Sequence, residues 1–134
     1  KLYLLDVFGD ADQGVPDRWL SGWKSLDKVN ERFSEKEHVE IIINTTEKGS
    51  ELFENEHFDF IYIDADHRYE SVKKDLNNWF PKMKKGGIFA GHDYVVKKDF
   101  GVIQAVDEFV KENNIKNFKT FSWPGHPWNI SWLI

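Results

Sequence analysis

Apolar and polar residues follow two periods along the chain, the alternation of a half-buried strand and the spacing of about 3.6 residues of an amphipathic helix. Runs rich in β-branched and aromatic side chains predict strands at residues 1–7, 39–43, 58–64, 88–91, 117–123 and 128–134. Helical spacing of apolar residues predicts helices at residues 17–33, 45–53, 71–83 and 102–112. Asp17 is the expected cap of the first helix, Trp19 and Trp23 lie on its apolar face, and Pro81 disturbs the end of the third.

Strands that alternate with helices predict a parallel sheet covered by helices on both faces. The link at residues 124–127 is short, so the last two strands form an antiparallel hairpin. The pair of lysines and the pair of glycines at residues 84–87 are expected to break the third helix before the fourth strand. A length of 134 residues suits a single domain over residues 1–134. The fold class is therefore α/β, with a mostly parallel sheet and a C-terminal antiparallel hairpin.

The composition narrows the classes of function. The net charge is −5 and basic residues do not gather in long blocks, which argues against nucleic acid as a partner. Apolar runs are far shorter than the roughly 18 residues of a membrane span, so we expect no membrane partner and take the cytoplasm as the default compartment. The absence of cysteine excludes disulfides, thiolate metal sites and a cysteine nucleophile.

Polar side chains follow three of the predicted strands. In an open α/β sheet, ligands bind outside the carboxyl ends of the strands, so these residues are the candidate site. They are Asp6 after the first strand, Asp64, Asp66 and His67 after the third, and His92 and Asp93 after the fourth.

Two chemical uses fit these residues. Carboxylates and an imidazole on adjacent loops can coordinate a divalent cation, Mg²⁺ through oxygen ligands or Mn²⁺ with an imidazole as well. Such a cation lowers the pKa of a substrate hydroxyl, and Asp66 or a neutral histidine can take the proton. The plainer interpretation is that the same groups cap helices and tighten loops. Asp6 can likewise accept the hydroxyls of a ribose or satisfy nearby backbone N–H groups.

Three segments carry a resemblance to a known family. They are FDFIYIDADHRYESVKKDL at residues 58–76, W–PK–KKGGIFAGHDY at residues 79–94 and FGVIQAVDEF at residues 100–109. Together they resemble the class I S-adenosylmethionine-dependent methyltransferases of type 24, and are similar to the sugar O-methyltransferases of macrolide and aminocoumarin biosynthesis. More distantly they are similar to catechol-type O-methyltransferases. The resemblance implies a Rossmann-like sheet and methyl transfer to an oxygen of a small-molecule acceptor, such as a sugar, a phenol or a hydroxy acid.

The resemblance also assigns cofactor-binding residues. Asp6 falls where the family holds the ribose of S-adenosylmethionine, and Thr45 and Thr46 fall in the turn that contacts adenine. Helix capping is the alternative for both threonines. Asp64 is included among the cofactor-binding residues as well as among the metal ligands.

The resemblance also assigns metal ligands and a general base. Asp64, His92 and Asp93 fall at the metal-ligating positions of the metal-dependent relatives, and Asp66 falls at the position of the general base. His92 departs from the family, which has a carboxylate or amide there. This departure weakens a Mg²⁺ site and makes His92 the second candidate for the base.

The family pattern begins with a strand and a glycine-rich turn that wraps the methionine part of the cofactor, whereas here the strand-like run opens at Lys1. We therefore expect a fragment of a longer protein, with its sheet interrupted between the strands that end at Asp6 and at Asp64. Unpaired strand edges favour association, so a homo-oligomer is expected.

Two other classes are weighed. The first is a non-catalytic methyltransferase-like domain that binds a partner through its tryptophan-rich surface. The second is a phosphoacceptor receiver domain with Asp64 as the phosphorylated residue. A receiver domain needs an acidic pair after its first strand and a lysine after its last strand, and this sequence has neither.

Overall fold

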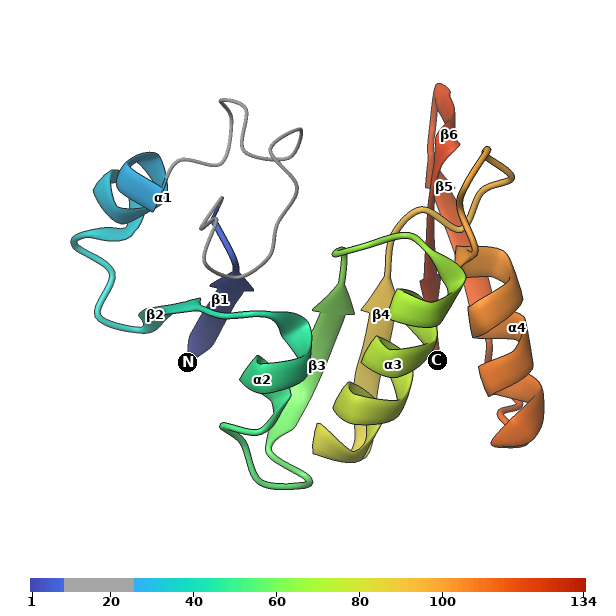
Figure 1. Cartoon of the computed structure of the whole chain (residues 1–134), viewed down its shortest axis with the longest axis horizontal. Helices are drawn as coiled ribbons and strands as arrows, with labels where there is room; N and C mark the ends of the chain where they lie inside the picture. Colours follow the sequence, from blue (N-terminus) through green and yellow to red (C-terminus); the bar gives the residue numbers. More distant parts are fainter. Residues whose placement is uncertain (9–25) are drawn as a thin grey trace. The chain divides into compact units, whose positions relative to one another are not determined.

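The computed structural model describes residues 1–8 and 26–134, so Asp17, Trp19 and Trp23 lie outside the described residues. The described chain divides into two compact units, Lys1–Gly49 and Ser50–Ile134, and each is described by itself (Figure 1). No helix of the described residues is both long and apolar enough to cross a membrane.

The first unit is built on a pair of parallel strands, β1 (Leu2–Asp6) and β2 (Val39–Ile43). Helix α1 (Leu26–Phe33) lies between them in the chain, and α2 (Thr46–Ser50) follows β2. A side chain at Gly49 would collide with Leu5, because the added Cβ would lie 2.1 Å from its Cδ1 atom. Glycine at this position therefore lets α2 approach β1.

The second unit contains a four-stranded sheet in the order β3-β4-β6-β5. Its strands are β3 (Phe58–Ile63), β4 (Met83–Gly91), β5 (Lys119–Trp123) and β6 (His126–Leu133). β3 and β4 are parallel, and β6 runs antiparallel to both β4 and β5, which confirms the predicted C-terminal hairpin. The described strands thus form two sheets, one in each unit.

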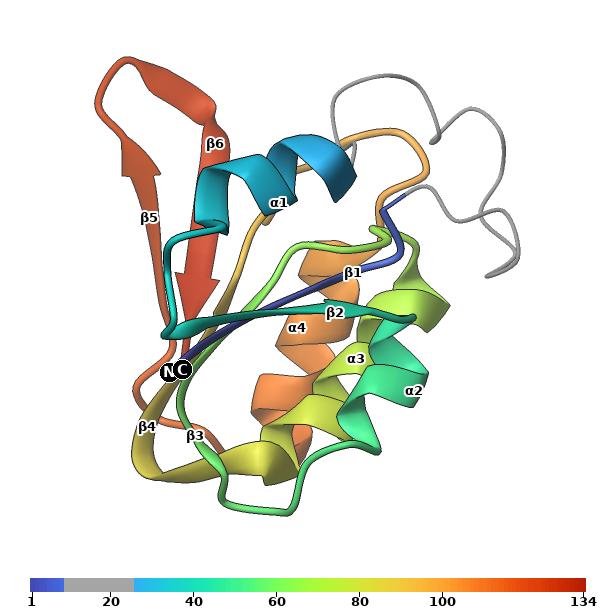
Figure 2. The same cartoon turned by 90° about the vertical axis from the view of Figure 1, so that its left-hand side faces the viewer.

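Helices α3 (Tyr69–Trp79) and α4 (Val102–Glu112) pack together on one face of this sheet (Figure 2). Aromatic rings fill the space beneath them: Phe89 meets Trp132 edge-on with ring centroids 5.7 Å apart. Leu76 and Val106 are fully buried in the same layer. The opposite face of the sheet carries exposed Phe60, Tyr62 and Ile88.

The sequence misplaced the junction between α3 and β4. Pro81 lacks an N–H group, so the α-helix ends at Trp79 and one 3-10 turn, η3 (Phe80–Lys82), follows. Met83, predicted on the helix, is instead the first residue of β4. Residues 84–87 were predicted to break a helix, but they belong to β4 as an irregular segment in which Gly86 has φ +79°.

The first strand was predicted to be buried and is only partly so, since Leu2 is 45% exposed. The predicted helices at residues 45–53 and 17–33 correspond to the shorter α2 and, within the described residues, to α1. Strand β2 and helix α4 have the predicted bounds.

Gly91 tests how tightly the end of β4 is packed. An added Cβ would lie 2.4 Å from Cζ2 of Trp132 and 2.7 Å from the carbonyl oxygen of Ile63. We expect Gly91→Ala to lower the free energy of unfolding by about 1–3 kcal/mol through overpacking, measured by urea unfolding. Gly86→Ala is the matched control, because it meets no atom within 4 Å and carries only the cost of its positive φ, about 1 kcal/mol. Equal stability of the wild type and Gly91→Ala would contradict this packing.

Candidate functional site

The candidate site lies on the two loops that follow β3 and β4. Ile63 is paired with Gly91 in the parallel register, so both strands end at the same level of the sheet. The backbone N–H of His92 donates to the carbonyl oxygen of Ile63 at 3.0 Å, which ties the second loop to the end of β3. Residues after these two strands are therefore brought to one edge.

Asp64, His67 and Asp93 gather at this edge, each with one ligand atom within 4.8 Å of the others. Nε2 of His67 lies 2.7 Å from Oδ2 of Asp93 and 3.6 Å from Oδ1 of Asp64. His92 also lies beside Asp93, with Nδ1 3.3 Å from the same Oδ2 atom. The structure thus brings together the predicted Asp64 and Asp93, with His67 rather than His92 as the imidazole that reaches both carboxylates.

The orientation of His67 is set by the segment that leads into α4. Its ring stacks on Phe100 with centroids 4.4 Å apart and planes 6° from parallel. Its carbonyl oxygen accepts a hydrogen bond from the N–H of Gly101 at 2.8 Å. Sequence reasoning named His67 in the cluster but left it out of the ligand set. The available signal was its place after the third strand, three residues from Asp64.

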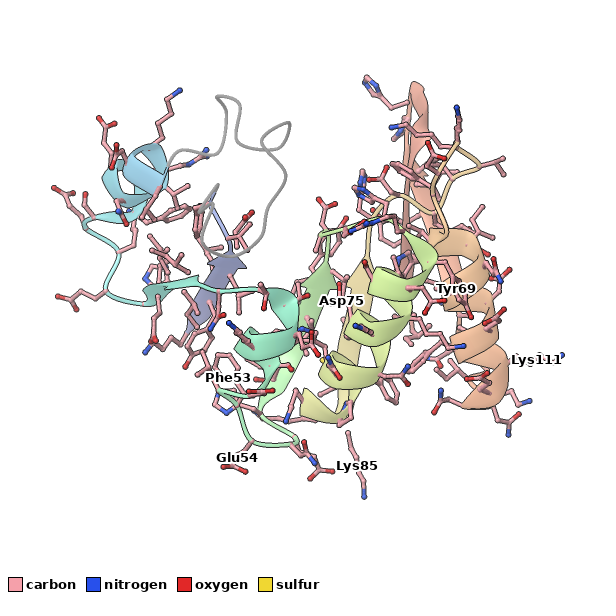
Figure 3. The ribbon with its side chains drawn as sticks, viewed as in Figure 1. Phe53, Glu54, Tyr69, Asp75, Lys85 and Lys111 are labelled. Carbon is pink, nitrogen blue, oxygen red and sulfur yellow. The ribbon has the colours of Figure 1, made fainter. Side chains whose placement is uncertain are left out.

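Gly101 lies directly against Tyr69, since an added Cβ would be 2.4 Å from Cβ of Tyr69. Tyr69, labelled in Figure 3 at the start of α3, donates its hydroxyl to Oε2 of Glu108 in α4 at 2.5 Å. The first turn of α3 is therefore held against α4, next to the segment of Phe100 and Gly101 that contacts His67.

Asp93 adopts a left-handed backbone conformation with φ +53°. Aspartate tolerates this region better than most residues, because its short polar side chain can bond locally. Its carboxylate is 21% exposed and faces two imidazoles, whereas the Asp64 side chain is 53% exposed. Solvent therefore reaches the cluster from the side of Asp64.

Asp66 has a different environment from its neighbours in the same loop. Its carboxylate accepts hydrogen bonds from Nε of Arg68 at 2.7 Å, from the N–H of Arg68 at 3.0 Å and from the hydroxyl of Ser71 at 3.1 Å. Burial acts to raise the pKa of Asp66, but the hydrogen bonds from Arg68 and Ser71 outweigh it and the pKa is lowered. Asp66 thus tightens the loop that leads into α3, whose N-cap residue is Arg68, and its lowered pKa makes it a weaker base.

The predicted cofactor residues of the first unit show the plainer of their two roles. Oδ1 of Asp6 accepts a hydrogen bond from the N–H of Phe8 at 2.9 Å. Oγ1 of Thr45 accepts from the N–H of Lys48 at 3.3 Å, which caps α2, and Thr46 is the first residue of that helix. Their roles toward ribose and adenine stay predictions.

Two surface hollows of the second unit lie away from this chemistry. One, of about 260 Å³, runs along the C-terminal half of α4, and the other, of about 240 Å³, lies beside the start of β4. Neither hollow is lined by Asp64, His67 or Asp93.

Solved structures with the same fold include several group-transfer enzymes. A candidate rRNA methylase from Clostridium thermocellum is 13% identical with a TM-score of 0.67, and the match covers 99% of this chain and 70% of that one. The O-methyltransferase NovP is 20% identical with a TM-score of 0.65, over 97% of this chain and 58% of that one. Spermidine synthase from Thermotoga maritima is 16% identical with a TM-score of 0.56, over 99% of this chain and 43% of that one.

These identities show a shared Rossmann-like fold, and the chain spans between 43% and 70% of the three structures. No curated protein matches the sequence. A family model described as a methyltransferase domain, of type 24, matches residues 2–94, a range that includes every predicted cofactor, metal and base residue. The chain therefore belongs to the type 24 methyltransferase-domain family, as its three motifs indicated.

Proposed function

We propose that this chain is part of an S-adenosylmethionine-dependent enzyme that methylates a hydroxyl oxygen of a small molecule or sugar. The observation that carries the proposal is the cluster of Asp64, His67, His92 and Asp93 at the carboxyl ends of β3 and β4, inside the range that matches the family. Similarity to the O-methyltransferase NovP supports oxygen as the acceptor atom. Spermidine synthase has the same fold, so the fold alone does not indicate methyl transfer. The support for methyl transfer is the match to the family.

The reaction needs alignment and a base. The acceptor oxygen forms a bond to the methyl carbon as the carbon–sulfur bond breaks, the sulfur leaves with the bonding electrons as a thioether, and the hydroxyl proton goes to the base. Holding oxygen, carbon and sulfur in line supplies much of the rate. Asp6 is the residue proposed to hold the ribose, with Thr45 and Thr46 at the adenine.

His92 is the better of the two candidates for the base. Histidine is the side chain that most often acts as a general base. Asp93 lies 3.3 Å from its Nδ1 atom and stabilises the protonated ring. Asp66 is the weaker candidate because Arg68 and Ser71 already occupy its carboxylate.

A divalent cation fits the cluster, since Nε2 of His67 is buried without a hydrogen bond from the described residues while two carboxylates lie beside it. Asp64 and Asp93 would hold the ion, with an imidazole as a third ligand. When bound, it would lower the pKa of an acceptor hydroxyl.

Cofactor binding is the first testable consequence. In calorimetric titration of the full-length protein with S-adenosylhomocysteine, we expect Asp6→Asn to weaken binding by about 10- to 100-fold, because hydrogen bonds to a charged acceptor contribute about 1.5–3 kcal/mol. Asp59→Asn is the control, as this carboxylate is exposed and pairs with Lys84. Unchanged affinity in Asp6→Asn would remove Asp6 from the cofactor site.

The base is tested by kinetics. We expect His92→Asn to lower kcat by about 10²- to 10⁴-fold and to abolish the limb of the pH–rate profile that reports an imidazole. Retention of that limb in a folded His92→Asn protein would exclude His92 as the base.

Asp66 is tested by stability. The fold lowers its pKa, so its stabilising contribution is present above the ordinary carboxyl pKa of about 3.9 and is lost as the pH falls through the lowered value. We expect Asp66→Asn to lower the urea midpoint at neutral pH, by an amount that shrinks in acid, and to leave the pH–rate limb in place. Loss of all activity in a stable Asp66→Asn protein would return the base role to Asp66.

A further inference from the structure

We propose that β5 is the contact surface of a homodimer, in which its free edge pairs with β5 of a second copy of the chain. The two strands run antiparallel, and Phe121 of one copy lies opposite Phe121 of the other on the two-fold axis. The inference goes beyond the proposed function, because it concerns assembly and uses none of the residues assigned to the reaction. It places the homo-oligomer expected from the sequence at one particular strand.

The first argument is that β5 is an edge strand. The sheet of the second unit has the order β3-β4-β6-β5, so β5 pairs with β6 on one side and with no strand of this unit on the other (Figure 2). Its residues 119–122 are exposed. The free edge of a strand presents a row of N–H and C=O groups, which can pair with a strand of another chain. Within this unit the main chain of β5 is therefore open to strand addition.

The second argument is that β5 has few of the features that protect an edge strand. Natural proteins protect such edges with charged side chains, proline or bulges. In residues 119–122 the only charge is that of Lys119, and there is no proline. The register shift against β6 comes after Ser122. At the centre of the strand stands Phe121, an aromatic side chain that is 51% exposed. Exposed apolar surface on an open edge is typical of a contact with another chain.

Phe121 also extends an apolar face of the sheet to its edge. It lies opposite Ser131 of β6, whose hydroxyl is hydrogen-bonded to that of Tyr62 at 3.0 Å. Residues opposite each other in an antiparallel pair point to the same face. Phe121 therefore shares the face of exposed Phe60, Tyr62 and Ile88, opposite the face that α3 and α4 cover. Pairing at β5 would cover part of the Phe121 ring with the same ring of the second copy.

The third argument is that β5 is self-complementary about Phe121. In a two-fold contact the same surface is used on both copies, so the residues on either side of the axis must suit each other. With Phe121 on the axis, Thr120 of each copy lies opposite Ser122 of the other. Aromatic pairs and pairs of threonine with serine both stabilise neighbouring antiparallel strands. The two copies of Lys119 lie at opposite ends of the contact, so like charges do not meet.

The length of β5 sets the expected strength of the dimer. The strand has five residues, so its pairing buries less surface than the roughly 1,200 Å² of the smallest stable interfaces. Contacts of that size are weak and exchange readily. We therefore expect a dissociation constant of about 10–500 µM, at which monomer and dimer coexist over the range that sedimentation measures.

The test is sedimentation equilibrium of the full-length protein from about 5 µM to 1 mM, a range chosen to span the expected dissociation constant. The weight-average mass of the wild type should rise with concentration toward that of a dimer. Phe121→Lys and Phe121→Glu each place like charges on the axis and should weaken association by about 10-fold or more. An equimolar mixture of the two variants should associate again, because lysine then lies opposite glutamate. Val96→Lys is the matched control, since Val96 is an apolar residue of the same unit that is 95% exposed.

A cross-link measures the register directly. Paired residues of antiparallel strands have Cα atoms about 4.5–5.5 Å apart, a distance that a disulfide spans. The described residues contain no cysteine, so Phe121→Cys introduces a single thiol there, and mild oxidation should link two copies of this variant. Val96→Cys, oxidised in the same way, gives the background.

Four results would each overturn the proposal. They are a wild type that stays monomeric to 1 mM, unchanged association of folded Phe121→Lys, no association in the mixture of the lysine and glutamate variants, and no cross-linking of Phe121→Cys above that of Val96→Cys. Circular dichroism checks that the variants fold, which the exposure of Phe121 favours. The proposed methyl transfer is measured separately, and its presence or absence does not bear on the dimer.

Discussion

The parallel pairing of β3 with β4 is the constraint on which the second unit depends. Its register sets Ile63 beside Gly91, so the two strands end together and their following loops begin at one level. The absence of a side chain at Gly91 lets Trp132 of β6 lie against the end of β4. The same pairing fixes where the chains after β3 and β4 emerge, and carboxylates from the two loops meet there as a consequence.

The sequence predicts best the elements whose pattern is short and clearly bounded. Strand β2 and helix α4 have the predicted ends because turn residues flank a clean period. At Met83 the helical spacing of apolar residues continues past the true end of α3, and periodicity alone does not show that Pro81 has ended the helix. Residues 84–87 have the composition of a turn, and within β4 they form an irregular segment between two paired residues, Met83 opposite Phe58 and Ile88 opposite Phe60.

The candidate site, too, is predictable where it follows from local pattern and strand order, and not where it depends on tertiary contacts. Asp64 and Asp93 were expected together because each follows a strand, and strand order alone determines that edge. The position of the His67 ring between these two carboxylates was not expected, because the ring stacks on Phe100 and its backbone binds Gly101, and both residues lie beyond α3 and β4 in the sequence. Such a contact joins segments distant in the sequence, and neither segment carries a local pattern that announces it.

The two carboxylates of the loop after β3 show how one short segment divides its roles. Asp66 is bound by Arg68 and Ser71, which lower its pKa and commit it to holding the start of α3. Asp64 is half exposed and lies 3.6 Å from an imidazole nitrogen, so it keeps its oxygens directed at the cluster. Groups of one type placed in environments that differ this much serve different purposes. The position that the family uses for a base is occupied by contacts with Arg68 and Ser71 in this chain, and this is the reason for proposing His92 as the base instead.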